Sequence, residues 1–256
     1  MLQDFTKQAF DIIIQAGQSN SEGYGFGNVD APYEPSDSVY YLNGDFTISM
    51  AVEKVAGNGI QSNFALPFAR EYIQNGHLAE GRKLLILRSA VGGTGFLDHR
   101  WGLTDDLYLR MMDMIRTALE LNPQNRLVAL LWHQGETDAD RQASYDVHYN
   151  HLLTLLQSVK DTFSTPALPF VAGDFVHDWK SKHEEMCAPV IAALRDVCND
   201  CGHGGFVETA DLLSNLQENV EHPFGWQDDI HFSRRSIYAL GKRYYDCFAQ
   251  IHASEA

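Results

Sequence analysis

Short runs of apolar residues alternate along the chain with longer stretches in which apolar positions recur every three or four residues. The short runs predict β-strands at Phe10–Ala16, Val39–Leu42, Lys83–Ala90, Leu127–Trp132 and Leu168–Ala172, with Gly205–Thr209 as a candidate for a short sixth strand. The longer stretches predict amphipathic helices at Asn63–Asn75, Asp105–Leu121, Ser144–Phe163, Lys182–Asn199 and Ser233–Ile251. This alternation of strands and helices is typical of a parallel sheet covered by helices on both faces.

The residues at the ends of these elements, and the segments between them, indicate a single domain. Ser233 stands where an N-cap of the last helix is expected, because its hydroxyl can accept a hydrogen bond from the first turn. No repeat, low-complexity tract or Pro/Ser-rich linker interrupts the 256 residues, so we predict a single domain, 1–256. The segment from Ser21 to about Gln61 is long for a connection, and loops of that size are usually functional or carry minor structure of their own.

Charge and composition exclude several classes of partner. With 45% hydrophobic residues the chain can bury a full core, and its formal net charge is -15. This charge argues against a nucleic acid and against an anionic membrane surface, and it suits neutral substrates such as sugars and their esters. No segment has the roughly 20 apolar residues of a membrane helix, and the N-terminus lacks the features of a signal peptide. We therefore expect a cytoplasmic protein, unless a signal peptide was removed ahead of this sequence.

The four cysteines do not have the spacing of a disulfide framework in a chain of this length. The stretch from Cys198 to His203 superficially resembles a metal site, but it lacks the second ligand pair that a closed zinc site requires. Reduced cysteines are the better interpretation. We expect neither a metal nor a cofactor.

Side chains typical of catalysis gather in four short segments: Gly17–Asn20, Ala90–Thr94, Trp132–Asp138 and Asp228–His231. The first three follow predicted strands, and the fourth precedes the last helix. Because ligands bind outside the carboxyl ends of the strands in an open α/β sheet, these segments are expected to meet at one edge. There Ser19 supplies a nucleophile, and the Asp-x-x-His arrangement of Asp228 and His231 supplies a base with an orienting acid.

These segments together resemble the SGNH (GDSL-like) hydrolase superfamily, in particular the carbohydrate acetylesterases related to sialate O-acetylesterase and family 6 acetylxylan esterases. The motifs are Gly-Gln-Ser-Asn, Gly-Gly-Thr, His-Gln-Gly-Glu and Asp-x-x-His, and the resemblance extends from Asp11 to about Phe248. Gln134 stands where many members of the superfamily have Asn. The Gln matches the acetylesterase branch. The resemblance implies a three-layer α/β/α sandwich with a central, mostly parallel, five-stranded flavodoxin-like sheet.

The chemistry of acyl transfer assigns a role to each residue. Ser19 attacks the ester carbonyl, His231 takes its proton and returns it to the leaving hydroxyl, and Asp228 fixes the imidazole tautomer. The oxyanion of the intermediate requires hydrogen-bond donors placed beforehand. The predicted donors are the backbone N–H of Ser19, the backbone N–H of Gly92 and the side-chain amide of Gln134; the N–H of Gly93 is an alternative to that of Gly92.

Some side chains near these motifs admit two interpretations. Asp229 competes with Asp228 as the orienting acid. Glu136 is either a second acid for His231 or a support for its own loop, and we favour the second because one carboxylate suffices. Trp101 is either a sugar platform or core. Arg88 is expected to pair with a carboxylate.

The hypothesis that follows is a metal-independent serine esterase that removes O-acetyl groups from carbohydrates through an acetyl-enzyme intermediate. Acetylated xylan, other hemicellulose fragments, acetylated sialic acids and small acetylated sugars all remain open as substrates, and the oligomeric state is not predicted. Two alternatives are a glycan-binding protein without turnover and a flavodoxin-like nucleotide binder. The loop containing Gly23, Gly25 and Gly27 matches neither common phosphate-binding pattern, which disfavours the nucleotide binder.

Overall fold

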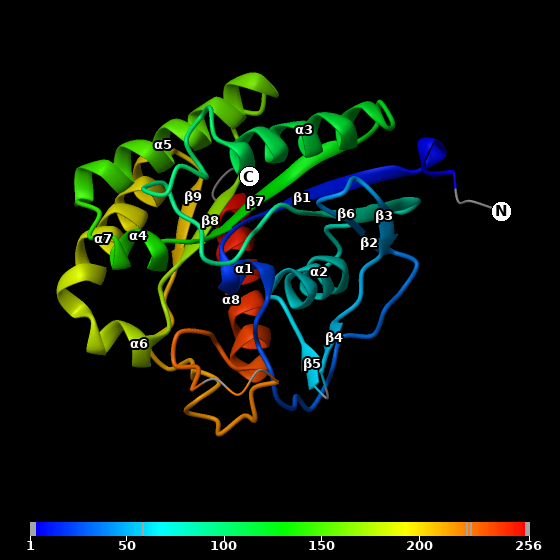
Figure 1. Cartoon of the computed structure of the whole chain (residues 1–256). Helices are drawn as coiled ribbons and strands as arrows, with labels where there is room; N and C mark the ends of the chain where they lie inside the picture. The colour runs from blue at the N-terminus through cyan, green and yellow to red at the C-terminus, as the bar shows by residue number, and fades with distance from the viewer. Residues whose placement is uncertain (1–3, 58, 224, 226, 254–256) are drawn as a thin grey trace.

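A sheet of seven strands lies between two layers of helices in the computed structural model, which describes residues 4–57, 59–223, 225 and 227–253 (Figure 1). The strand order is β3-β2-β6-β1-β7-β8-β9, and all neighbouring pairs are parallel except β2 with β3. The strands are β1 (Ala9–Gly17), β2 (Val39–Leu42), β3 (Ile48–Met50), β6 (Arg82–Arg88), β7 (Arg126–His133), β8 (Phe170–Gly173) and β9 (Gly204–Val207).

The centre of the sheet explains why the apolar runs are continuous rather than alternating. β1 pairs with β6 on one side and β7 on the other, and Ile12, Ile13 and Ile14 are all fully buried. A strand covered by helices on both faces has no polar side to show. The five predicted strands and the candidate at Gly205–Thr209 are confirmed, each with ends within two residues of the prediction.

The long helices form the two outer layers. On one face lie α3 (Asp106–Glu120), α5 (Tyr145–Thr162) and α7 (Glu184–Asp200), and on the other lie α2 (Ala65–Gln74) and α8 (Arg234–Ala253) (Figure 1). All five were predicted, and the N-cap is confirmed because the backbone N–H of Ser236 donates to Ser233 Oγ at 3.2 Å.

Two details of the predicted sheet are wrong. It has seven strands rather than five, because β9 forms and β3 adds a short antiparallel edge. Its parallel strands, numbered along the chain, lie in the order 2-3-1-4-5-6, whereas a flavodoxin-like sheet has 2-1-3-4-5. Buried strands with similar apolar runs carry no signal that tells which neighbour each one pairs with, so the sequence pattern could not fix this order.

The segment from Ser21 to Gln61 has minor structure of its own, as expected. Besides β2 and β3 it carries the two-stranded hairpin of β4 (Lys54–Ala56) and β5 (Gly59–Gln61). Four short helices were not predicted: η1 (Phe5–Lys7), α1 (Ser19–Glu22), α4 (Glu136–Asp140) and α6 (His177–Lys182). Each is too short to show an apolar period.

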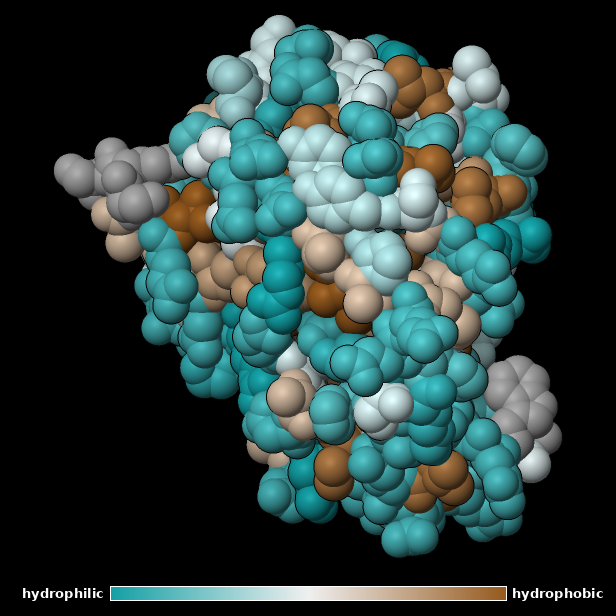
Figure 2. Space-filling model, turned by 90° about the vertical axis from the view of Figure 1, so that its left-hand side faces the viewer, coloured by the Kyte–Doolittle hydropathy of each residue, from teal (hydrophilic) through white to brown (hydrophobic). Residues whose placement is uncertain are grey.

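The surface is mostly hydrophilic on the face that Figure 2 shows, with hydrophobic residues in separate patches. Within the described residues, none of the helices has the length and apolar character needed to cross a membrane.

The turn after β1 brings the catalytic candidates together. Gly17 has φ +123°, and a Cβ there would lie 2.1 Å from the carbonyl oxygen of His133 on the neighbouring strand. The same carbonyl accepts the N–H of Gln18 at 2.9 Å, which joins the ends of β1 and β7. α1 then begins at Ser19, beside the loop that follows β7.

Candidate active site

Ser19, His231 and Asp228 form one continuous chain of hydrogen bonds. Ser19 Oγ lies 2.8 Å from His231 Nε2, and His231 Nδ1 lies 2.7 Å from Asp228 Oδ1. All three residues are buried, with 4–8% of each exposed. The structure therefore brings the predicted nucleophile, base and acid together, although Ser19 and His231 are 212 residues apart in sequence.

Asp228 is held by more than the histidine. Asn215 Nδ2 donates to its Oδ2 at 2.8 Å, and the backbone N–H of His231 donates to its Oδ1 at 3.2 Å. Burial by itself raises the pKa of Asp228, but the hydrogen bonds from His231 and Asn215 outweigh it and hold the pKa below its ordinary value. Asp229 faces away and pairs with Lys182 Nζ at 2.9 Å, so Asp228 is the acid that contacts the imidazole.

The loop that carries the histidine is fastened to the serine segment by Asn20. Its Oδ1 accepts the backbone N–H of Phe232 at 3.1 Å, and its Nδ2 donates to the carbonyl of Ile230 at 3.0 Å. The ring of Tyr24 stacks on the imidazole of His231, with centroids 5.0 Å apart. These contacts fix the position of His231 relative to Ser19.

Glu136 lies beside this site but does not reach the histidine by a hydrogen bond. Its Oε1 accepts from Asn20 Nδ2 at 2.8 Å, and its Oε2 is buried with no hydrogen-bond partner in the described part of the chain. Burial raises the pKa of Glu136, against the lowering effect of the Asn20 hydrogen bond. The contact with Asn20 favours the interpretation of Glu136 as a structural support rather than as a second acid for His231.

The predicted oxyanion donors differ in their availability. No acceptor among the described residues takes the N–H of Ser19 or of Gly93, whereas the N–H of Gly92 donates to Glu22 Oε2 at 2.8 Å. A Cβ added at Gly93 would meet no atom within 4 Å, so this residue borders open space.

The amide of Gln134 is not brought to the cavity. It is fully buried, and its Nε2 donates to Asp138 Oδ2 at 2.8 Å and to the carbonyl of Thr94 at 3.3 Å. Asp138 also accepts the backbone N–H groups of Phe96 and Leu97, so this cluster joins the loop after β6 to the loop after β7.

A cavity of about 780 Å³ is lined by Ser19 and His231, among other residues. Its lining includes residues that the motifs did not single out, namely Tyr24, Arg141 and Trp179. Tyr24 and Trp179 supply aromatic faces of the kind that sugars contact, but they lie outside the four motifs and so carried no signal. The interpretation of Trp101 as a sugar platform is wrong: it is fully buried, and its Nε1 donates to Thr94 Oγ1 at 3.0 Å.

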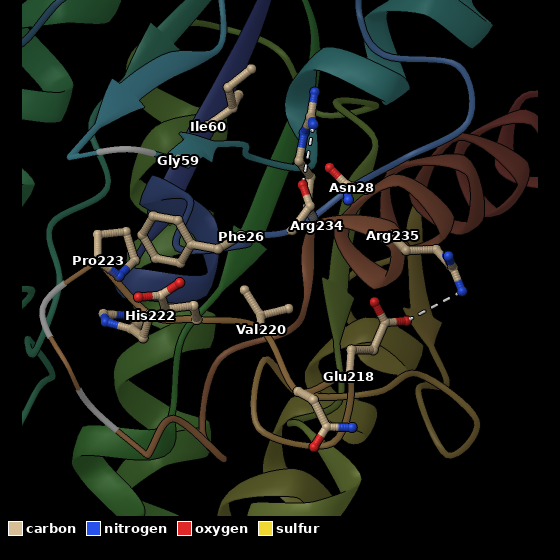
Figure 3. Close-up of a pocket in the computed structure, with 13 residues that line it drawn as sticks. Phe26, Asn28, Gly59, Ile60, Glu218, Val220, His222, Pro223, Arg234 and Arg235 are labelled. Atoms are coloured by element: carbon tan, nitrogen blue, oxygen red, sulfur yellow. Dashed lines mark hydrogen bonds and ion pairs between the residues drawn. The ribbon is translucent and has the colours of Figure 1, made fainter.

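A second cavity, of about 580 Å³, has Phe26, His222 and Arg234 among its lining residues (Figure 3). His222 stands in its wall, packs edge-on against Phe26, and has its Nε2 3.3 Å from Asp228 Oδ2. Arg234 in the same wall is bound to Glu53.

His133, which lies in the same motif segment as Gln134, is part of the core. His133 is fully buried, its Nδ1 lies 2.9 Å from the hydroxyl of Tyr244, and burial lowers its pKa to about 3, so it is neutral. The four cysteines are free thiols. In the part of the chain that the structure describes, no group of three or more His, Cys, Asp or Glu side chains is arranged to hold a metal ion.

A Ser–His–Asp hydrogen-bond chain at the carboxyl edge of an α/β sheet is the arrangement expected of the serine hydrolase class. The comparison with protein families gives the particular group. The family described as carbohydrate esterase, sialic acid-specific acetylesterase matches residues 9–250, and the chain belongs to this family. The description of that family names a carbohydrate esterase with acetylesterase activity.

Individual relatives are more distant. The chain is 33% identical over 88 residues to the "Probable 9-O-acetyl-N-acetylneuraminic acid deacetylase" of Escherichia coli (strain K12). That match spans 32% of this chain and 27% of the relative's length.

Three solved structures share the fold. NanS superposes with a TM-score of 0.82 at 18% identity, over 96% of this chain and 98% of NanS. An Arabidopsis thaliana protein gives a TM-score of 0.67 at 18% identity, over 94% and 98% of the two chains. A carbohydrate acetylesterase from Xanthomonas citri gives 0.60 at 14% identity, over 95% of this chain and 57% of its own. Identities this low establish the fold alone.

Proposed function

We propose that this protein removes O-acetyl groups from a carbohydrate, with Ser19 as nucleophile, His231 as general base and acid, and Asp228 as the orienting carboxylate. The observation that carries the proposal is the hydrogen-bond chain of 2.8 and 2.7 Å that ends at a cavity of substrate size. A serine hydroxyl is a weak nucleophile until a base accepts its proton, and this geometry supplies the base.

The first half of the reaction acylates the enzyme. Ser19 Oγ bonds to the acetyl carbon while its proton passes to His231 Nε2, and the ionised Asp228 stabilises the imidazolium through Nδ1. When the tetrahedral intermediate collapses, the bond between the carbonyl carbon and the sugar oxygen breaks. The same proton then passes from Nε2 to the departing sugar oxygen.

The second half restores the enzyme. A water molecule gives its proton to His231 Nε2 and attacks the acetyl carbon, the bond to Ser19 Oγ breaks, and acetate leaves while Oγ regains a proton. In both halves the oxyanion is stabilised by preorganised donors.

The N–H groups of Ser19 and Gly93 suit the oxyanion role, because both are without acceptors at the cavity. The N–H of Gly92 is already held by the carboxylate of Glu22, so it is not counted among these donors. Gln134 has an indirect role, because its amide donates to the carbonyl of Thr94 in the loop that carries these glycines. The earlier assignment of Gln134 as a direct donor would require its amide to leave Asp138.

The substrate class rests on the relatives. The family description and the name of the Escherichia coli relative both refer to sialic acids, which favours an O-acetylated sialic acid. Acetylated xylan and other hemicellulose fragments are the competing substrates.

The test compares Ser19→Ala with Ser21→Ala, using 4-nitrophenyl acetate and an O-acetylated sialic acid. Ser21 is a matched control because it is buried two residues away and its Oγ has no partner. Ser19→Ala should lower kcat by at least about 10³-fold with an unchanged melting temperature, whereas Ser21→Ala should keep most of the activity. Near-normal turnover by Ser19→Ala would refute the proposal.

A further inference from the structure

A third cavity, of about 330 Å³, adjoins the catalytic cavity and has an unusual charge. The two share Glu22 and Val91 in their linings. The third cavity is also lined by Lys54, Arg88 and Arg110, so three cations face it against one carboxylate. The chain has 19 Lys and Arg against 34 Asp and Glu, so an average part of its surface carries more negative than positive charge. The local excess of positive charge at this cavity departs from that average.

These cations lack the carboxylate partners that most others in this chain have. Arg82, Arg234 and Arg243, for example, lie within 2.7 Å of a carboxylate oxygen. Among the described residues, no carboxylate lies within 4.0 Å of a charged nitrogen of Lys54, Arg88 or Arg110. Arg88 instead lies over the ring of Tyr41, 4.9 Å from its centroid, so the expected carboxylate pair for Arg88 is wrong.

Arg110 is the member of the group whose side chain has a buried hydrogen-bond donor without an acceptor among the described residues. Its Nη2 donates to the carbonyl of Ser89 at 3.1 Å, but its Nε is buried and has no hydrogen-bond partner among the residues that the structure describes. Burial lowers the pKa of Arg110 without removing its charge, since guanidinium stays protonated. A buried donor without an acceptor is costly, and a planar guanidinium matches the two oxygens of a carboxylate.

The one carboxylate in the wall is already occupied. Glu22 Oε2 accepts the N–H of Gly92 at 2.8 Å, at the boundary between the two cavities. Its charge attracts Arg110, but it makes no ion pair with that residue within 4.0 Å, which leaves the cationic side of the cavity free for a ligand.

We propose that this basic cavity binds the carboxylate of an acidic sugar whose O-acetyl group lies at Ser19. The inference rests on the proposed function, and it names the part of the substrate that these residues recognise. Arg110 and Arg88 hold the carboxylate from two sides, and Lys54 adds charge at the exposed rim. A neutral acetylated xylan fragment would leave this cavity without its partner.

The test separates charge recognition from turnover by comparing two substrates that differ only in that charge. They are 9-O-acetyl-N-acetylneuraminic acid and its C1 methyl ester, and the readout is the ratio of kcat/KM for the acid to that for the ester. Arg110→Gln should lower this ratio by about 10- to 100-fold, and Arg88→Gln should lower it in the same direction. Arg116→Gln is the matched control, since it lies on the same helix and pairs with Asp113 on the surface; it should leave the ratio unchanged. For the wild type, added salt should lower the ratio, since it screens the attraction.

A binding measurement keeps the inference testable whatever the rate of turnover. Calorimetric affinity of the Ser19→Ala protein for the acetylated acid should fall by a similar factor when Arg110→Gln is added. If the wild-type ratio is near one, if Arg110→Gln weakens acid and ester equally, or if only Arg141→Gln lowers the ratio, the proposed subsite is wrong. A different result would refute the proposed function and still support the carboxylate site. In it, no ester is hydrolysed in a way that depends on Ser19, yet Arg110→Gln still lowers the affinity for the acetylated acid.

Discussion

Asp228 and Asp229 are neighbours in sequence with the same side chain, yet their surroundings give them different roles. Asp228 is buried and accepts hydrogen bonds from the imidazole, from Asn215 and from a backbone N–H, whereas Asp229 pairs with Lys182 near the surface. The motif spacing favoured Asp228, and the structure supplies the contacts. If Asp228 is the orienting carboxylate, as proposed, substitution of Asp228 should affect activity far more than substitution of Asp229.

Replacing Asp228 with Asn keeps the size of the side chain but removes the charge that stabilises the imidazolium and fixes its tautomer. We expect Asp228→Asn to lower kcat for 4-nitrophenyl acetate by about 10³- to 10⁴-fold, as in other serine triads. Asp229→Asn is the control and should stay within about threefold of wild type, because a surface ion pair contributes little. Equal losses in the two variants, measured by steady-state kinetics, would contradict the assignment.

At the scale of elements, the carboxyl ends of β1 and β7 are joined so closely that only glycine fits at Gly17. A Cβ there would lie 2.1 Å from a backbone oxygen, which cannot move aside as a flexible side chain would. The turn therefore aims α1, and Ser19 with it, at the loop that carries His231.

Substitution at this turn should be more destructive than at a glycine that has the same backbone constraint but open space. Gly17→Ala should lower the free energy of unfolding by about 2–5 kcal/mol, from positive φ together with steric overlap. Gly81→Ala, at φ +77° with no atom within 4 Å of the added Cβ, should cost only about 1–2 kcal/mol. Urea unfolding measures both, and a smaller loss for Gly17→Ala than for Gly81→Ala would be inconsistent with this geometry.

The long elements were predictable because their signals are strong. Five strands and five helices follow from apolar runs and periods, and the edge at which the motifs meet follows from the general rule for parallel sheets. The short helices α1, α4 and α6 were not predictable, although two of them begin at Ser19 and Glu136. In each, local turns and tertiary contacts set the conformation.

The finer parts of the site depend on contacts that form only in the folded chain. A backbone N–H has no sequence signature, so the engagement of Gly92 by Glu22 and the free N–H of Gly93 emerge only in the fold. The same holds for Gln134, whose amide is drawn to Asp138, and for Trp101, which is core rather than platform. Each outcome depends on a contact across the sheet edge that spacing in sequence does not encode.

At the scale of the whole molecule, the catalytic arrangement joins the beginning and the end of the chain. The first parallel strand places Ser19, and the loop before α8 places His231, so the site exists only when β1 and α8 have both packed on the sheet. Activity should therefore be lost in the same transition as the global fold. The basic cavity beside Glu22 should be lost in that transition as well.

The proposed mechanism depends most on one covalent step, the attack by Ser19 Oγ. The most direct measurement is labelling of the wild-type protein with a serine-reactive fluorophosphonate, followed by peptide mass mapping. The predicted result is a single adduct on the peptide that contains Ser19, absent in Ser19→Ala and formed more slowly in Asp228→Asn. An unlabelled protein, or an adduct on another residue that persists in Ser19→Ala, would contradict the account.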